Sequence, residues 1–283
     1  MVGTSLNSVH DMPASREKYI PNSVPINKIL GFNPHIIIKP YDKKTLGTFR
    51  ATMVSQWLQN LMIEYNLVSL EKKDSYSSLI QMPGIILEKL IKWALENLPD
   101  EILVGFDPNW DRPHLVEVDE RFSFPKNKKQ LFAGEGYILG EPNIVNRGDS
   151  FSVHHIPEEW TDDFFAVDRG PRGGRFTHWL HTHPNAVAIP SGADADAAQY
   201  TEGIDMILGM QFSPEGMYPW FDDIEGERRP LISKNKSVIG IASTGHLIHG
   251  LEVIAYHRSG VGINVIFVDE NNYPYGWKNF ILE

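Results

Sequence analysis

The 283-residue sequence predicts a layered α/β or α+β domain that follows an N-terminal extension. Three observations favour this class. Short runs rich in β-branched residues recur along the chain, as is typical of strands. Two segments before residue 100 space their apolar side chains at helical intervals. The apolar fraction, 42%, is ordinary for a globular protein with one sizeable core.

The first 80 residues are expected to form the extension, with at least one helix. Residues 1–25 are polar and favour a loose arm, and the β-branched run at 35–40 predicts a strand. The helix is predicted at 46–67, where apolar residues recur at helical spacing. The polar, Ser-rich residues 68–82 indicate a linker. The main domain is therefore expected to span residues 81–283.

A second helix is predicted at 83–98, with Pro83 in its first turn and an apolar stripe that includes Ile86 and Leu90. A third is predicted at 193–208, with Ser191 as its N-cap. The strands predicted in this domain are 101–106, 114–123, 131–139, 151–156, 176–183, 237–243, 250–257 and 262–269.

Composition excludes several classes of function. The net charge of −10 makes the chain a poor candidate for binding nucleic acid. The absence of cysteine excludes a disulfide framework and thiolate chemistry. No apolar run approaches the roughly 20 residues that span a bilayer, so we expect no membrane partner. The N-terminus lacks the profile of a secretory signal, which favours a cytoplasmic location. The pattern does not indicate an oligomeric state.

The stretch FTHWLHTHPNAVAIPSGAD at 176–194 holds the candidate site. His181 and His183 are two residues apart in a predicted strand, so they project from the same face. Asp194 lies in the first turn of the next predicted helix, and the intervening turn can return its carboxylate to the two histidines. Two imidazoles and one carboxylate form a catalytic zinc set with a fourth position open for water. We therefore predict one zinc ion per chain.

The spacing of this stretch resembles the signature of the JAMM (MPN+) zinc metalloproteases, the isopeptidases that remove ubiquitin and ubiquitin-like proteins. The motif HTHP at 181–184 is followed by six residues and then by SGAD at 191–194. Trp179 is similar to the tryptophan that often precedes the family's first histidine. The resemblance is sharp over 176–208 and implies an α/β/α domain with a central mixed β-sheet over 81–283.

The resemblance also implies the roles of the site residues. His181, His183 and Asp194 would bind zinc, and Ser191 would help to stabilise the tetrahedral oxyanion. A glutamate from an upstream strand would take a proton from water and later give it to the leaving amine. In the family this glutamate usually stands in a Glu-x-x-Gly pattern, after a helix and at the start of an apolar strand.

Two glutamates each match part of that pattern. Glu135, in GEGYILG, lies 46 residues before His181 and in a segment similar to the family strand, but it is next to Gly136. Glu101, in LPDEILVGF, follows a predicted helix and precedes a glycine by four residues, but it lies 80 residues upstream of His181. We favour Glu135 as the general base and keep Glu101 as the alternative.

The function that the resemblance implies is zinc-dependent hydrolysis of an amide or isopeptide bond. The expected substrate is the C-terminal tail of a ubiquitin-like or sulfur-carrier protein. Two alternatives stay open at this point. One is a zinc hydrolase of the same fold that cleaves small peptides or amides. The other is an inactive MPN subunit that serves as a scaffold or in protein interactions.

Overall fold

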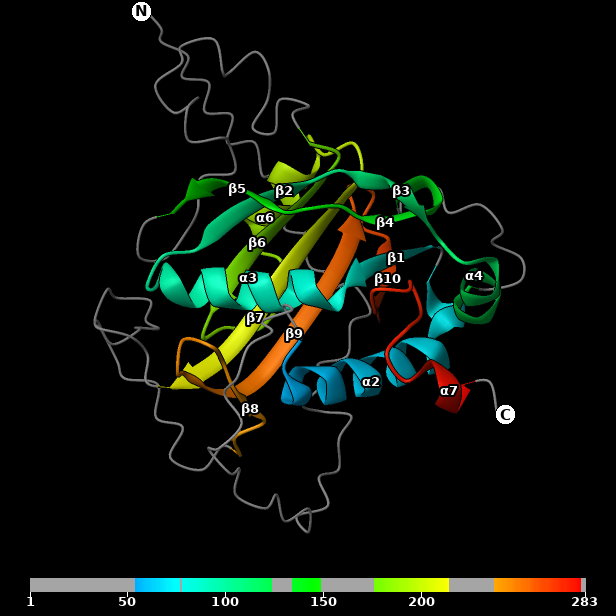
Figure 1. The fold of residues 1–283 in the computed structure, drawn as a ribbon. Helices are drawn as coiled ribbons and strands as arrows, with labels where there is room; N and C mark the ends of the chain where they lie inside the picture. The colour runs from blue at the N-terminus through cyan, green and yellow to red at the C-terminus, as the bar shows by residue number, and fades with distance from the viewer. Residues whose placement is uncertain (1–53, 77, 124–133, 149–175, 214–236, 281–283) are drawn as a thin grey trace, which may run out of the picture.

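An eight-stranded mixed sheet forms the centre of the structure (Figure 1). The computed structural model describes residues 54–76, 78–123, 134–148, 176–213 and 237–280. Strands follow the order β1-β10-β9-β7-β6-β2-β5, and β8 pairs with β9. Their bounds are β1 Leu79–Pro83, β2 Ile102–Phe106, β5 Asn143–Arg147, β6 His178–Pro184, β7 Ile204–Ser213, β8 Gly240–Ile241, β9 Leu247–His257 and β10 Gly262–Val268.

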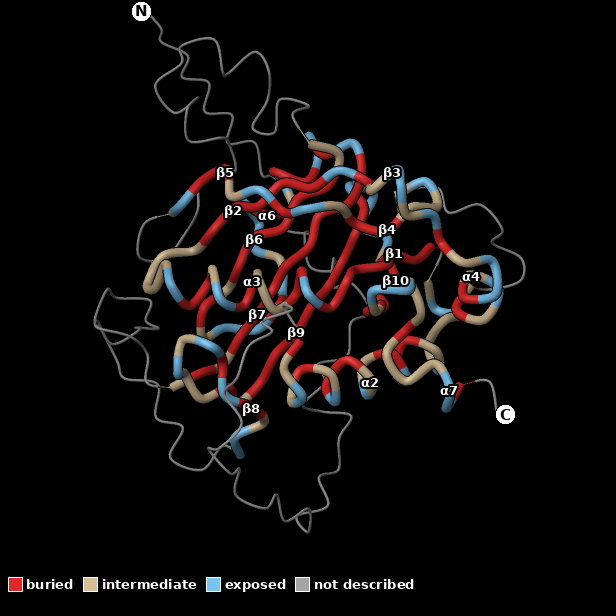
Figure 2. Tube along the Cα trace, viewed as in Figure 1, coloured by how far each residue is buried: buried red, intermediate tan, exposed pale blue. Residues whose placement is uncertain are grey.

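The sheet contains both parallel and antiparallel pairs. β1 and β10 are parallel, as are β6 and β7, and the other neighbours in the order are antiparallel. Strands β3 (Pro108–Pro113) and β4 (Tyr137–Leu139) form a separate antiparallel pair. The central strands are buried along most of their length (Figure 2), as expected for a sheet covered on both faces. The predicted mixed α/β class is therefore confirmed.

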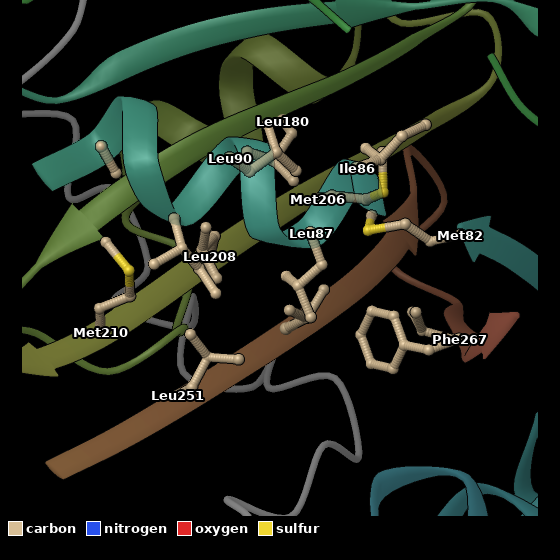
Figure 3. Close-up of a cluster of buried hydrophobic side chains, with 14 of the residues drawn as sticks. Met82, Ile86, Leu87, Leu90, Leu180, Met206, Leu208, Met210, Leu251 and Phe267 are labelled. Atoms are coloured by element: carbon tan, nitrogen blue, oxygen red, sulfur yellow. The ribbon is translucent and has the colours of Figure 1, made fainter. Parts of the chain in front are cut away.

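Helices cover the two faces of the sheet. Their bounds are α2 Gln56–Glu71, η1 Lys73–Ser75, α3 Gly84–Glu96, α4 Val116–Phe122, η2 Gly134–Gly136, α6 Gly192–Ala198 and α7 Trp277–Phe280. Figure 3 shows Leu87 and Leu90 of α3 among apolar side chains of the sheet, which include Leu180 and Met206. On the other face, Ala198 of α6 belongs to a separate buried cluster with residues of β7 and β9. α6 thus lies on the face opposite to α3.

Helix α2 corresponds to the helix predicted in the N-terminal extension. It packs against the main sheet and contributes to the same hydrophobic core. Its Leu58 and Met62 belong to the same buried cluster as α3. Its Asn66 amide donates to the Phe267 carbonyl at 2.8 Å and accepts from the Phe267 N–H at 2.8 Å, which fixes the helix to β10. The predicted arm and the strand at 35–40 lie outside the described residues.

The prediction of a linker at 68–82 was wrong. α2 continues to Glu71, and all five residues of β1 are buried beside β10. The prediction rested on the polar, Ser-rich composition of this segment, but polar residues in it can be buried: Gln81 is fully buried, and its amide donates to Asp119 at 3.1 Å. The boundary that we placed between residues 80 and 81 falls inside β1.

Two further assignments are corrected. Residues 116–122 form helix α4 and not part of a strand, because Val118 and Phe122 are buried four residues apart on one helical face. The helix predicted at 193–208 ends at Ala198, and β7 begins at Ile204 between β6 and β9. A short apolar run does not separate a buried strand from a buried helix.

The other predicted elements are confirmed to different extents. The helix at 83–98 and the strands at 101–106, 176–183, 250–257 and 262–269 are confirmed within a few residues. Only Tyr137–Leu139 forms a strand in the described part of 131–139, and β8 is a two-residue strand within 237–243. The predicted strand at 151–156 lies outside the described residues. No helix in the described ranges is long and apolar enough to cross a membrane.

Candidate metal centre

Strand β6 presents two histidines on the face of the sheet that α6 covers. His181 and His183 alternate with Leu180 and Thr182, whose side chains point to the other face. Leu180 is buried in the core beneath α3. The Thr182 hydroxyl is buried and accepts a hydrogen bond from the Ile102 N–H at 3.0 Å. The opposite face of β6 is thereby fixed, and the histidines are held in one orientation.

The start of helix α6 fixes the third ligand candidate. Ser191 is its N-cap, as predicted, and the Ser191 Oγ accepts from the Asp194 N–H at 3.2 Å. In return, the Ser191 N–H donates to Asp194 Oδ2 at 2.6 Å. This reciprocal capping box satisfies two backbone donors and orients the carboxylate. Asp194 is only 5% exposed, so its charge is largely withdrawn from water.

The three predicted ligands meet at one point. His181 Nε2 lies 3.0 Å from His183 Nε2 and 3.1 Å from Asp194 Oδ1, and His183 Nε2 lies 3.7 Å from Asp194 Oδ2. A tetrahedral zinc ion with bonds of 2.0–2.1 Å separates neighbouring ligand atoms by about 3.3 Å. The observed separations fall on both sides of that value. This group, which is largely buried, could therefore hold a metal ion.

A backbone carbonyl sets the tautomer of His183. Its Nδ1 lies 2.9 Å from the Val187 oxygen. A carbonyl only accepts, so Nδ1 carries the proton and the neutral ring presents a lone pair on Nε2. This is the protonation state that a metal ligand needs, and metal-bound histidines usually have such an outer partner.

The pKa of His183 reflects the carboxylates around it. Burial alone would lower this pKa, but the hydrogen bonds to Asp194 and to the Val187 carbonyl, with the charges of Glu101 and Asp194, raise it above its ordinary value. In the metal-free protein, a proton is therefore well stabilised where a cation would bind. Proton and metal compete for this position, so metal affinity should fall with acidification.

The structure places Glu101, and not Glu135, beside the histidines. Leu103 of β2 pairs with His181, and continuing this register by two residues places Glu101 opposite His183 on the same face. Its charge contributes to the raised pKa of His183. Glu135 is exposed in η2, with φ 52° and ψ 27°, and leads into the separate β3–β4 pair. That pair extends from the end of β2 remote from His183.

The loop between His183 and Ser191 lies directly on β7, and the motif did not predict this contact. A Cβ on Gly209 would lie 2.7 Å from the Ala188 nitrogen and 2.9 Å from the Ala186 oxygen, so only glycine leaves room for this loop. Asn185 begins the loop with a positive φ of 52°, and its Oδ1 accepts from the Phe212 N–H at 2.9 Å. An isolated glycine in a strand is the sequence signal of such a close approach.

Comparison with models of known protein families found no match for this chain. Comparison with curated proteins found no similar sequence. The function must therefore be argued from the residues of the site and their arrangement.

Proposed function

We propose that the chain is a zinc-dependent metallopeptidase of the JAMM type that hydrolyses an amide or isopeptide bond. The observation that carries the proposal is the convergence of His181, His183 and Asp194, at the spacing of the motif, with Glu101 on the same face. A central mixed sheet with α3 on one face and α6 on the other is compatible with the α/β/α arrangement that the resemblance implies.

In this proposal His181, His183 and Asp194 hold the zinc ion. When bound, zinc supplies a Lewis acid for the scissile carbonyl and lowers the pKa of water. The Glu101 carboxylate is half-buried beside His183, where it can accept a proton and then deliver it to the leaving amine. Ser191 is exposed, and accepting from the Asp194 N–H leaves its hydroxyl proton to donate to the developing oxyanion.

We propose the C-terminal tail of a ubiquitin-like or sulfur-carrier protein as the substrate. The support is the motif itself, together with apolar surface on the loop between the ligands. Val187 and Ile189 are 41% and 49% exposed, so they offer contacts for an extended peptide beside the site.

The test is cleavage of ubiquitin-like proteins, carrying C-terminal fusions or isopeptide-linked lysine peptides, by the zinc-loaded chain. Glu101→Gln should lower kcat by about 100-fold or more, because it removes the proton carrier. Glu135→Gln is the matched control and should keep wild-type activity, because that side chain is exposed in η2, next to the remote strand pair.

Other outcomes separate the alternatives. A zinc-loaded protein that cleaves short peptides but no folded partner would favour the small-substrate hydrolase. A protein that binds zinc and cleaves neither class would contradict the proposal and favour the scaffold.

A further inference from the structure

Strand β9 places a buried carboxylate behind the metal centre. His183 pairs with Gly209 of β7, and Gly209 pairs with Glu252 of β9, so His183 and Glu252 lie in one row on one face of the sheet. Glu252 is only 8% exposed. A buried carboxylate is costly unless it is hydrogen-bonded, so its partner shows what it stabilises.

That partner is the loop that carries the backbone acceptor of His183. Glu252 Oε2 accepts from the Ala188 N–H at 3.1 Å. The carbonyl of the same peptide group belongs to Val187 and accepts from His183 Nδ1–H at 2.9 Å. The N–H and C=O of a trans peptide point in opposite directions, so this one group connects Glu252 to His183.

We propose that Glu252 is a positioning residue of the metal centre and acts through the Val187–Ala188 peptide group. An anionic acceptor polarises the peptide, which strengthens its carbonyl as an acceptor for His183 Nδ1–H. The imidazole is then held with Nδ1 protonated and Nε2 directed at His181 and Asp194. Outer partners of metal-binding histidines are usually a carboxylate or a carbonyl, and here the two act in series.

The inference rests on the proposed function only for its zinc site. The measurement is the zinc affinity of the full chain, by competition with a chromophoric chelator at fixed pH. Glu252→Ala should weaken zinc binding by about 10- to 100-fold, the usual effect of losing an outer partner. Glu252→Gln keeps an oxygen for the Ala188 N–H without the charge, so its affinity should lie between those of wild type and Glu252→Ala.

The chain offers a matched control on the opposite face of the sheet. Glu88 of α3 also accepts from a backbone N–H, that of Ser55, at 2.7 Å. Glu88→Gln makes the same chemical change away from the ligands and should leave zinc affinity unchanged. A second readout is the NMR signal of His183 Nδ1–H in the zinc-loaded protein, which should exchange faster with water in Glu252→Ala.

The outcomes distinguish this inference from the peptidase proposal. A folded Glu252→Ala protein that binds zinc within twofold of wild type, with an unchanged His183 signal, would overturn the role of Glu252 and leave the peptidase untouched. Weakened zinc binding in a protein that cleaves no substrate would support the role of Glu252 and overturn the peptidase. A wild-type chain that binds no zinc would overturn both.

Discussion

Replacement of Asp194 separates two roles that one carboxylate performs. Oδ2 accepts from the Ser191 N–H and so completes the capping box of α6, and both oxygens face the imidazoles of His181 and His183. Asp194→Asn keeps an acceptor for the cap but loses the charged ligand. Asp194→Ala loses both. In zinc-free protein, the Ala variant should therefore be less stable than the Asn variant by one cap interaction, about 1 kcal/mol.

Zinc should add a second, larger difference. A ligand at 100 times its Kd stabilises the folded state by about 2.7 kcal/mol if the unfolded chain does not bind it. For a chain of this size, that stabilisation corresponds to a rise in Tm of roughly 5–10 °C. The wild type should show this rise, and both Asp194 variants should lose most of it.

The assay is thermal unfolding of chelator-treated protein, followed by circular dichroism over stepwise additions of zinc. Asp196→Asn is the control, because Asp196 is an exposed acid on the same helix and should keep the full shift. A full zinc shift in Asp194→Asn would refute Asp194 as a ligand. Equal stability of the Asn and Ala variants without zinc would refute the capping argument.

Three further predictions concern residues of β6 and β7, the two strands that carry and support the candidate site. Gly209→Ala forces the ligand loop off β7 and should lower both stability and zinc affinity, which unfolding and chelator competition would measure. Thr182→Val leaves the Ile102 N–H without its acceptor and should cost about 1–3 kcal/mol in urea unfolding. Burial lowers the pKa of His178 to about 4, so the unfolded chain takes up this proton first and stability should fall from pH 6.5 towards pH 4. The loss should reach about 3 kcal/mol, and His178→Asn should flatten this part of the pH profile.

The convergence of the three candidate ligands could be predicted from the sequence because these residues are close along the chain. His181 and His183 share one strand, and Asp194 follows after a single loop, so strand alternation and a helix cap are sufficient to bring them together. The overall α/β class was also accessible, since strands such as β9 and β10 carry their own β-branched pattern. The fold errors came from segments whose polarity or periodicity was ambiguous, such as the buried Gln81 in β1.

The proximity of Glu101 to the two histidines could not be predicted, because it depends on strand pairing. Glu101 precedes its glycine by four residues, one more than the Glu-x-x-Gly pattern. The distance along the chain was also a poor guide, since β2 lies directly beside β6 despite the long separation.

Sheet register also explains why the motif does not predict the residues that support the candidate site. His183, Gly209 and Glu252 form one row across β6, β7 and β9, and Glu101, the residue before β2, lies in line with this row. In that row they supply, in order, the proposed proton carrier, a proposed metal ligand, the space for the loop and the carboxylate that binds the loop. A slip of one residue in any of these strands would turn its side chain to the α3 face. The arrangement at the site is therefore a property of how the strands pair, and the motif specifies only its local part.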